Sequence, residues 1–349
     1  MERKKIRALI VDDSMLFREM LSRFIGEDTH IEVVGTAGDP YEARDKILEL
    51  RPDVVTLDVE MPRMNGIQFL KRLIPQYPIP VVVVSALPLN AFEAVEAGAV
   101  DFVKKPVVKS PNDLKIFSME LRTKIIIAST ARVIRRDPLA SQAVLPKSPV
   151  LTEAAGKRHG STILALGAST GGTDALQVVV ERLPKDSPPI LIVQHMPAGF
   201  TKMYAERMNR VCPMEVKEAE DGDRLRPGLA IIGAGEFHMR LAKDAKGYYI
   251  TSQRGEKVSG HCPSVDVLFH SVAEAAGENA IGAILTGMGG DGAKGLLAMR
   301  KAGAYTIGQD KDSCVVYGMP MVAYNIGGVC EQAPLTKISD IIIQKLNAL

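Results

Sequence analysis

Carboxylates and a lysine stand at the ends of apolar runs in the first third of the chain. IRALIVDD ends on Asp12 and Asp13, PDVVTLD ends on Asp58, and VDFVKKP carries Lys105. Clustered carboxylates suit the hard ion Mg²⁺, an aspartate can attack a phosphoryl group, and a lysine offers a point charge to phosphoryl oxygens. These residue types indicate a phosphoryl-transfer site, and Asp58, alone at the end of its run, is the expected acceptor.

Short parallel strands must position these residues. The runs IRALIVDD, IEVVG, PDVVTLD, IPVVVVS and VDFVKKP are separated by helical-looking stretches. This alternation predicts a parallel α/β sheet, in which ligands collect at the carboxyl ends of the strands. Ser85, at the end of IPVVVVS, adds a hydroxyl that can follow a new anion, and the peptide before Pro106 can be cis. Taken singly, each aspartate could instead be a turn former or helix N-cap.

The segments VDDS, LDVEMPRMNG, the Ser85 strand end and DFVKKP resemble the receiver domain of bacterial response regulators, from residue 6 to about 125. The resemblance implies a flavodoxin-like, five-stranded parallel domain that a histidine kinase phosphorylates on Asp58 in a Mg²⁺-dependent reaction. It also implies one role for each site residue: Asp12, Asp13 and Asp58 at the metal, Ser85 and Lys105 at the phosphoryl group, and Phe102 as the aromatic switch.

Length and composition limit the other possibilities. A chain of 349 residues can hold two domains, and 43 basic against 41 acidic residues do not indicate a nucleic-acid partner. The four cysteines lack paired metal-ligand spacing, which is typical of reduced thiols in a cytosolic protein. No apolar run reaches the length of a signal peptide's core or a membrane span. We therefore expect a cytoplasmic protein without direct membrane insertion.

A break in the sequence pattern divides the chain. Residues 111–136 have helical composition and are expected to close the first domain, residues 1–136, as one long helix. Residues 137–160 contain three prolines and few large apolar residues, which predicts an interdomain linker that would span about 25–30 Å as a random coil. Residues 161–349 are then the second domain.

A glycine-rich turn opens the second domain. The apolar run STILAL leads into the G-x-S-x-G pattern of residues 167–171 and then into the helical stretch TDALQVVVERL. A serine in such a strand-to-helix turn, here Ser169, lies above the sheet near a helix N-terminus, which suits a nucleophile. The same turn also suits phosphate binding by backbone amides, with Ser169 as an N-cap. This segment alone leaves both interpretations open.

Two later strand ends favour a nucleophilic Ser169. PPILIVQHMPAGF places His195, and NAIGAILTGMGGDGAKG places Asp291, where each can face the serine. A serine needs a neighbouring base, and a neutral imidazole needs a carboxylate that fixes its tautomer. We therefore predict His195 as the base and Asp291 as its orienting carboxylate, although either could merely cap an element. His261, in the loop GHCPSVDVLF, is the competing base.

The chain order of these residues bears on the fold. The three residues occur in the order Ser, His, Asp, which differs from the order Ser, Asp/Glu, His of the α/β-hydrolases. The repeated strand and helix patterns predict instead a Rossmann-like, doubly wound parallel sheet with an inserted antiparallel hairpin within residues 229–254.

Six segments resemble the catalytic domain of the chemotaxis protein-glutamate methylesterases: GASTGGTDAL, VQHMPAGFT, KEAEDGDRLRPG, CPSVDVLF, LTGMGGDGAKG and VVYGMP. The resemblance implies an oxyanion hole formed by the backbone amides of Thr170 and Met288. It implies a γ-glutamyl methyl ester substrate on the cytoplasmic helical bundle of a chemoreceptor, and no cofactor for the esterase reaction. It also allows deamidation of receptor glutamines.

Together these features predict a phosphorylation-regulated serine hydrolase of chemotaxis adaptation. The first domain would inhibit the second until Asp58 is phosphorylated. The alternative is a non-catalytic response-regulator adaptor whose C-terminal domain binds a phosphate or a nucleotide. An adaptor has no use for the set of Ser169, His195 and Asp291, and an esterase has no use for a tightly bound nucleotide.

Overall fold

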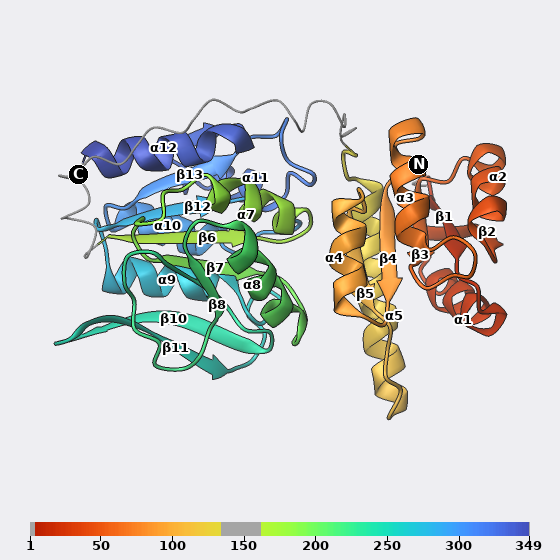
Figure 1. Cartoon of the computed structure of the whole chain (residues 1–349), viewed down its shortest axis with the longest axis horizontal. Helices are drawn as coiled ribbons and strands as arrows, with labels where there is room; N and C mark the ends of the chain where they lie inside the picture. Colours follow the sequence, from red (N-terminus) through yellow and green to blue (C-terminus); the bar gives the residue numbers. More distant parts are fainter. Residues whose placement is uncertain (1–3, 134–161, 349) are drawn as a thin grey trace. The chain divides into compact units, whose positions relative to one another are not determined.

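The chain forms two compact units, residues 1–144 and 145–349, each with its own parallel sheet (Figure 1). The computed structural model describes residues 4–133 and 162–348. The predicted linker, residues 137–160, therefore lies outside the described residues.

The N-terminal unit is a five-stranded parallel sheet with the strand order β2-β1-β3-β4-β5. Its strands are β1 (Ile6–Val11), β2 (Ile31–Ala37), β3 (Val54–Asp58), β4 (Val81–Ser85) and β5 (Asp101–Lys104). Its helices are α1 (Met15–Gly26), α2 (Pro40–Leu50), α3 (Gly66–Gln76), α4 (Pro88–Glu96) and α5 (Pro111–Ser129). This is the flavodoxin-like order, so the predicted fold of this unit is confirmed. All of β4 is buried, which explains why its valines run on without alternating with polar residues.

Helix α5 is shorter than the predicted segment 111–136. Near its start, the Asp113 carboxylate accepts a hydrogen bond from the Ser110 amide at 2.7 Å. At its other end, the hydroxyls of Ser129 and Thr130 donate to the carbonyls of Ile126 and Ile127, each at 2.7 Å. The backbone amides of Thr130 and Ala131 bond the carbonyls three residues back, at Ile127 and Ala128, so the last turn tightens and the described helix ends at Ser129.

The C-terminal unit contains a seven-stranded parallel sheet with the order β14-β13-β12-β6-β7-β9-β8. These strands are β6 (Ile163–Ala168), β7 (Ile190–Gln194), β8 (Glu215–Glu218), β9 (Leu229–Ile232), β12 (Ala280–Ile284), β13 (Tyr305–Gln309) and β14 (Glu331–Ala333). The predicted antiparallel hairpin is confirmed as β10 (Phe237–Asp244) and β11 (Gly247–Arg254). Residues 229–232, which the sequence grouped with the hairpin, instead pair in parallel with β7 and β8.

Helices cover both faces of this sheet, as a doubly wound fold requires. They are α7 (Gly172–Glu181), α8 (Phe200–Val211), α9 (Val265–Ala275), α10 (Ala293–Lys301), α11 (Met319–Asn325) and α12 (Leu335–Ala348). Figure 1 shows α9 and α12 on opposite sides of the sheet, and α9 packs against α10 while α12 packs against α7. Among the described residues, no helix is both long enough and apolar enough to span a membrane.

The strand order of the C-terminal sheet reverses at β6. The chain continues from β6 to β7 on one side, and later returns to β12 on the other. Ligands of such sheets bind outside the carboxyl ends of the strands at the reversal. Ala168 pairs with Gln194 across β6 and β7, so the next residues, Ser169 and His195, leave the sheet at the same level.

Candidate functional site

Three carboxylates meet where the N-terminal sheet reverses its strand order, between β1 and β3. One oxygen of each of Asp12, Asp13 and Asp58 lies within 4.8 Å of the others. Asp12 and Asp58 are buried, whereas Asp13 is exposed. Clustered carboxylate oxygens with one side open to solvent fit Mg²⁺, which binds a few carboxylates and keeps several waters.

Lys105 lies between the two buried carboxylates. Its ammonium nitrogen is 2.7 Å from Oδ2 of Asp58 and 3.0 Å from Oδ2 of Asp12. Burial raises the pKa of Asp58 to about 6, even though the hydrogen bond and the charge of Lys105 act in the opposite direction. Burial alone would lower the pKa of Lys105, but the two carboxylates outweigh it and hold that pKa above its usual value.

The loop that follows Asp58 passes directly over it. A Cβ atom at Gly66, the first residue of α3, would lie 2.3 Å from the carbonyl oxygen of Asp58. No side chain other than hydrogen fits there, so glycine allows the close approach of loop and strand. This packing fixes the chain on either side of the expected acceptor.

Ser85 and Phe102 lie near Lys105 but point to other partners. The Ser85 carbonyl accepts the Lys105 amide at 2.9 Å, while its hydroxyl donates to the Leu87 carbonyl at 3.1 Å. The Phe102 ring is buried and meets Phe92 edge-on, with 5.8 Å between ring centroids. The Lys105–Pro106 peptide is trans, contrary to the cis bond that the sequence allowed; trans is the lower-energy form for most such bonds.

The raised pKa of Asp58 predicts a pH-dependent effect on stability. We expect Asp58→Asn to stabilise the metal-free protein at pH 7.5, because above pH 6 the native state must hold a buried, ionised carboxylate that the unfolded chain ionises near 3.8. The gain should be on the order of 1–2 kcal/mol, since Lys105 loses a partner in the variant. It should shrink between pH 6 and pH 4 and vanish below, where Asp58 is protonated in both states. Calorimetric melting of the full chain in EDTA across this range measures it, and a gain that grows toward pH 4 would contradict the assigned direction.

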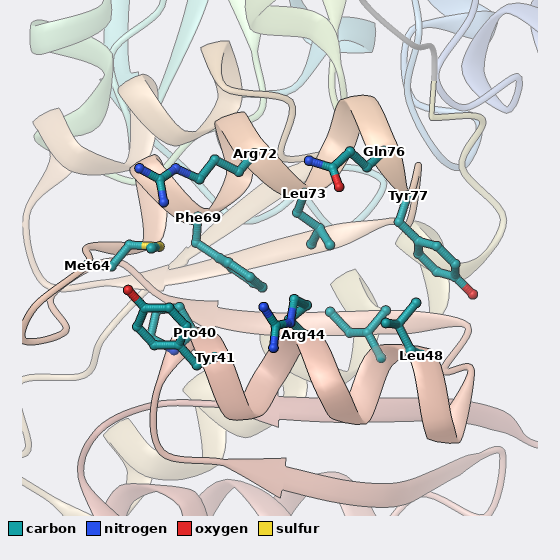
Figure 2. A pocket seen from close by; sticks show the side chains of 11 residues that line it. Pro40, Tyr41, Arg44, Leu48, Met64, Phe69, Arg72, Leu73, Gln76 and Tyr77 are labelled. Carbon is teal, nitrogen blue, oxygen red and sulfur yellow. The ribbon is translucent and has the colours of Figure 1, made fainter.

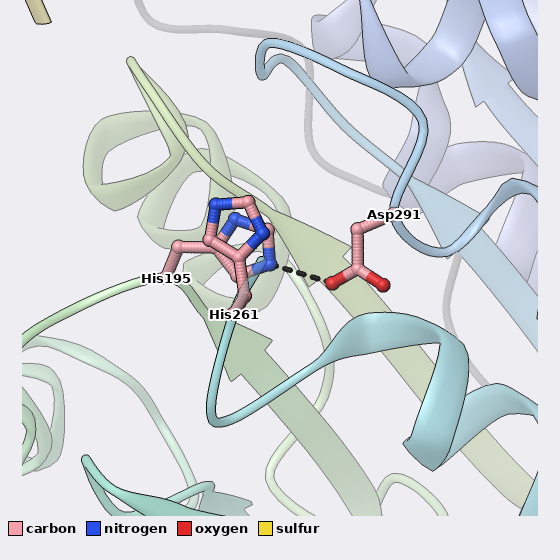
Figure 3. A group of neighbouring side chains, drawn as sticks. All are labelled: His195, His261 and Asp291. Carbon is pink, nitrogen blue, oxygen red and sulfur yellow. Dashed lines mark hydrogen bonds and ion pairs between the residues drawn. The ribbon is translucent and has the colours of Figure 1, made fainter. Parts of the chain in front are cut away.

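In the C-terminal unit, the structure brings His195 and Asp291 into direct contact. The His195 Nε2 atom is 2.7 Å from Asp291 Oδ2 (Figure 3). Both side chains are nearly inaccessible to solvent. Because Nε2 faces the carboxylate, the proton of a neutral ring lies there and Nδ1 carries the free lone pair. Nδ1 has no hydrogen-bond partner among the described residues, so it is the nitrogen left to act as a base.

Asp291 is fixed by the start of helix α9 as well as by His195. Its two oxygens accept the Ser264 hydroxyl and the Val265 amide, each at 2.7 Å, and the Asp266 amide at 3.1 Å. Burial by itself raises the pKa of this carboxyl, but the hydrogen bonds from His195, Ser264 and Val265 outweigh burial and lower the pKa. Asp291 is therefore an anion in a rigid setting, as an orienting carboxylate must be.

Ser169 lies in the turn that joins β6 to α7. Its carbonyl accepts the Gly172 amide at 2.7 Å and the side-chain amide of Gln194 at 2.9 Å. A Cβ atom at Gly172 would lie 2.1 Å from the Gln194 side chain, so the turn can close only around a glycine. Since Nδ1 of His195 is unpaired, it forms no hydrogen bond with Ser169 here; catalytic hydrogen bonds often tighten only with substrate bound.

The turn that carries Met288 lies directly beside Ser169. The Ser169 amide donates to the Thr286 carbonyl at 3.0 Å, and a Cβ atom at Gly287 would lie 2.7 Å from Cβ of Ser169. Met288 is exposed, and Thr170, next to Ser169, is buried. The two predicted oxyanion residues therefore flank the serine on neighbouring turns.

Sequence reasoning missed three features of this site. Ser264 was not assigned a role, although a serine ahead of the apolar run VDVLF is a typical helix N-cap. Gln194 was not singled out, and no sequence signal shows that its amide supports the Ser169 turn. His261 was considered only as a rival base, whereas its ring stacks on that of His195.

A separate cavity of about 410 Å³ lies between α2 and α3 of the N-terminal unit (Figure 2). Its lining is mainly apolar and aromatic, with Arg44 on the α2 side and Arg72 on the α3 side. The lining includes no carboxylate, histidine, serine or cysteine. It therefore lacks the groups for phosphoryl transfer or ester hydrolysis.

The C-terminal unit is a parallel α/β domain with Ser169, His195 and Asp291 near the point where its strand order reverses. The N-terminal unit has a carboxylate cluster at the corresponding point of its own sheet. Together they define a response regulator coupled to a hydrolase. The family model described as CheB methylesterase matches residues 164–342, and the model of the response regulator receiver domain matches residues 8–115. The chain belongs to the CheB methylesterase family.

Relatives extend the match over the whole chain. A protein named protein-glutamate methylesterase/protein-glutamine glutaminase 2 from Syntrophomonas wolfei is 54% identical over 349 residues, covering 100% of both chains. A protein-glutamate methylesterase/protein-glutamine glutaminase from Salmonella choleraesuis is 48% identical, covering 99% of this chain and 98% of its own. The CheB methylesterase catalytic domain of Thermotoga maritima, a crystal structure, is 38% identical with a TM-score of 0.52 and covers 53% of this chain and 98% of its own.

Proposed function

We propose that the chain hydrolyses γ-glutamyl methyl esters on the cytoplasmic helical bundle of chemoreceptors, in chemotaxis adaptation. The observation that carries this proposal is the hydrogen bond of 2.7 Å between His195 and Asp291, beside the Ser169 turn. The full-length relatives named as protein-glutamate methylesterases support the substrate class. The proposed location is the cytoplasm, where such a bundle lies.

Ser169 is the proposed nucleophile. Its Oγ attacks the ester carbonyl carbon while its proton passes to Nδ1 of His195, the nitrogen that Asp291 leaves free. The backbone amides of Thr170 and Met288 would donate to the oxygen that becomes negative, where aligned donors stabilise the transition state. The intermediate then expels methanol, which takes the proton back from Nδ1, and the glutamyl side chain is left as an ester of Ser169.

Water completes the reaction. It attacks the Ser169 ester and gives one proton to Nδ1 of His195. Collapse of the second intermediate returns that proton to Ser169 and releases the glutamate carboxylate. A glutamine side chain would follow the same course with ammonia as the first product, which agrees with the second half of the relatives' names.

The receiver domain is proposed to take its phosphoryl group from a chemotaxis histidine kinase onto Asp58. Asp12, Asp13 and Asp58 would hold Mg²⁺, which supplies positive charge for the phosphoryl oxygens when bound. Lys105 already contacts Oδ2 of Asp58 and can follow the charge to the phosphoryl group. Ser85 and Phe102 are the proposed switch residues, and for Ser85 this requires its hydroxyl to leave the Leu87 carbonyl.

Phosphorylation is proposed to relieve inhibition by the receiver domain. We expect a shortened chain that begins near Gly156 to hydrolyse methylated receptor faster than the unphosphorylated full chain, because the inhibitory domain is gone. Phosphorylation of the full chain should close much of that gap, since a few kcal/mol of differential interaction shifts a two-state equilibrium strongly. Equal or lower activity of the shortened chain, at equal concentration on the same receptor, would refute inhibition and leave partner recruitment as the domain's role.

Methanol release from methylated receptor is the direct test of the proposed function. The wild type should release methanol, and Ser169→Ala, which removes only the attacking oxygen, should not. Release by both proteins at the same rate would exclude Ser169 as the nucleophile. Absence of release by the phosphorylated wild type would exclude the activity itself.

A further inference from the structure

His261 lies against the face of the His195 ring and has no part in the proposed set of Ser169, His195 and Asp291. The ring centroids are 3.6 Å apart and the ring planes differ by 5°, so the imidazoles stack face to face (Figure 3). In Figure 3 the dashed bond to Asp291 leaves from His195, while His261 covers the ring. His261 therefore contacts the proposed base over its whole face.

The chain around His261 holds its ring firmly. The His261 amide donates to the Val258 carbonyl, and the Val258 amide donates back to the His261 carbonyl, both at 3.0 Å. Nδ1 of His261 is 2.9 Å from the Ser259 carbonyl, so Nδ1 carries the proton and donates it. Two residues further on, Pro263 leads into Ser264 and α9, the elements that bind Asp291. One loop thus supports both partners of His195.

The geometry argues against two other roles for His261. His261 is a poorer base than His195, because its Nδ1 donates to a backbone carbonyl, which lacks the negative charge with which Asp291 stabilises a protonated His195 ring. As a metal ligand it would have to share an ion with His195, whose nitrogens lie close to those of His261 and the oxygens of Asp291. The lone pair of an imidazole nitrogen lies in the ring plane, so two parallel stacked rings cannot both point at one ion. The contact is suited to packing.

The charge of the His261 ring matters because His195 must become an imidazolium during the proposed reaction. Burial, and then the charge of His195, lower the pKa of His261 to about 4, with Lys257 acting in the same direction and Asp291 opposing them. His261 is therefore neutral at neutral pH. A neutral ring can remain stacked on His195 while His195 takes a proton, whereas a charged one would repel it.

We propose that His261 is a positioning residue, which holds the His195 ring in the plane that joins Asp291 to Ser169 by presenting a flat, uncharged face. His195 makes one side-chain hydrogen bond, to Asp291, and its Nδ1 is unpaired among the described residues. A ring held by a single hydrogen bond can tilt about that bond, and the face of His261 at van der Waals distance prevents the tilt. This inference rests on the proposed esterase function of Ser169 and His195.

Substitutions that separate flatness from charge test the proposal on the phosphorylated full chain. His261→Phe keeps a flat, neutral face and should retain kcat for methanol release within about threefold of wild type. His261→Leu keeps an apolar side chain without a flat face and should lower kcat about 10–100-fold with KM unchanged, as misplacement of a catalytic group does. His270→Phe and His270→Leu, at an exposed histidine of α9, are the matched controls and should change neither constant.

A third substitution at position 261 tests the charge. His261→Arg supplies a planar group that can stack but is always charged, so kcat should fall and the acidic limb of its pH profile should move to lower pH. His261→Phe should keep the wild-type profile above pH 6. If His261 had a purely structural role, the substitutions would change the stability of the protein, but they would neither lower kcat at constant KM nor shift the pH profile of kcat. If His261→Leu does not fold, the contrast between the Phe and Arg variants decides.

Two outcomes would overturn the proposal. Wild-type kcat in His261→Leu would show that the stack is not needed, and a folded His261→Phe as impaired as His261→Leu would show that a ring nitrogen, not the ring face, matters. Both require an active wild type. They therefore differ from failure of the proposed function itself, in which the wild type releases no methanol or Ser169→Ala matches it.

Discussion

Ser169→Ala and His195→Ala are each expected to reduce methanol release from methylated receptor to near background, a loss of up to about a millionfold in turnover. The serine supplies the bond-forming oxygen, and His195 supplies a buried ring nitrogen, Nδ1, that has no hydrogen-bond partner among the described residues; the two residues leave β6 and β7 at the same level. Residues of such a set act as a unit, so losing either one costs about as much as losing both. Asp291→Ala should retain about 10–100-fold more activity than these two variants, because the imidazole can still accept a proton without it.

The competing base gives this prediction its control. His261→Ala removes the neighbouring imidazole but leaves Nδ1 of His195 and the bond to Asp291 in place, so its activity should remain far above that of His195→Ala. Turnover measured on the same methylated receptor compares the two. A dead His261→Ala beside an active His195→Ala would mean that the base has been misassigned.

Asp58→Asn is expected to abolish acid-labile phosphorylation of the full chain by a small phosphodonor. Asp58 ends β3 with its Oδ2 atom at the Lys105 ammonium, whereas Asp12 and Asp13 are neighbours in the chain and suit the metal. An amide cannot form the acyl phosphate, although it keeps the size of the carboxyl group. EDTA should abolish labelling of the wild type as well, since the metal supplies charge for the transfer.

A neighbouring aspartate serves as the control for that experiment. Asp53 precedes the same strand at its other end, where it accepts the Arg7 amide, so Asp53→Asn should be labelled like the wild type. Labelling is read as phosphate bound to the protein that is lost in acid. Persistent labelling of Asp58→Asn would rule out Asp58 as the acceptor.

The fold could be predicted from the sequence because the central strands β3, β4, β6 and β7 are buried along their whole length. In a parallel sheet covered on both faces, the strands read as continuous apolar runs, such as Val81–Val84 and Ile190–Val193. Each run ends where the sheet ends, so the residues that follow it had to share one edge. The end of α5 could not be predicted in this way, because the composition of residues 111–136 stays helical past Ser129, where the backbone amides of Thr130 and Ala131 change to carbonyls three residues back.

The identities of the candidate site residues came from the sequence, but their contacts did not. Spacing placed His195 and Asp291 at strand ends, and the register of β6 and β7 brings His195 level with Ser169. The packing of the loop before α9 decides which nitrogen of His195 contacts Asp291, and it places His261 on the face of the His195 ring. That loop has no hydrophobic periodicity from which its packing could be predicted. The orientation of the Ser85 hydroxyl likewise depends on a local hydrogen bond, to the Leu87 carbonyl, that the sequence does not reveal.

The bonding of Asp291 has a practical consequence for trapping a substrate. Its carboxylate is shared between His195 and the first turn of α9, so a change there disturbs the start of that helix as well as the proposed base. The turn that contains Ser169 is stabilised by hydrogen bonds of its backbone and of the Gln194 side chain, and the Ser169 hydroxyl is not among the groups that form these bonds. An inactive bait for isolating methylated receptor complexes should therefore be made at Ser169, where shape is kept and only reactivity is lost.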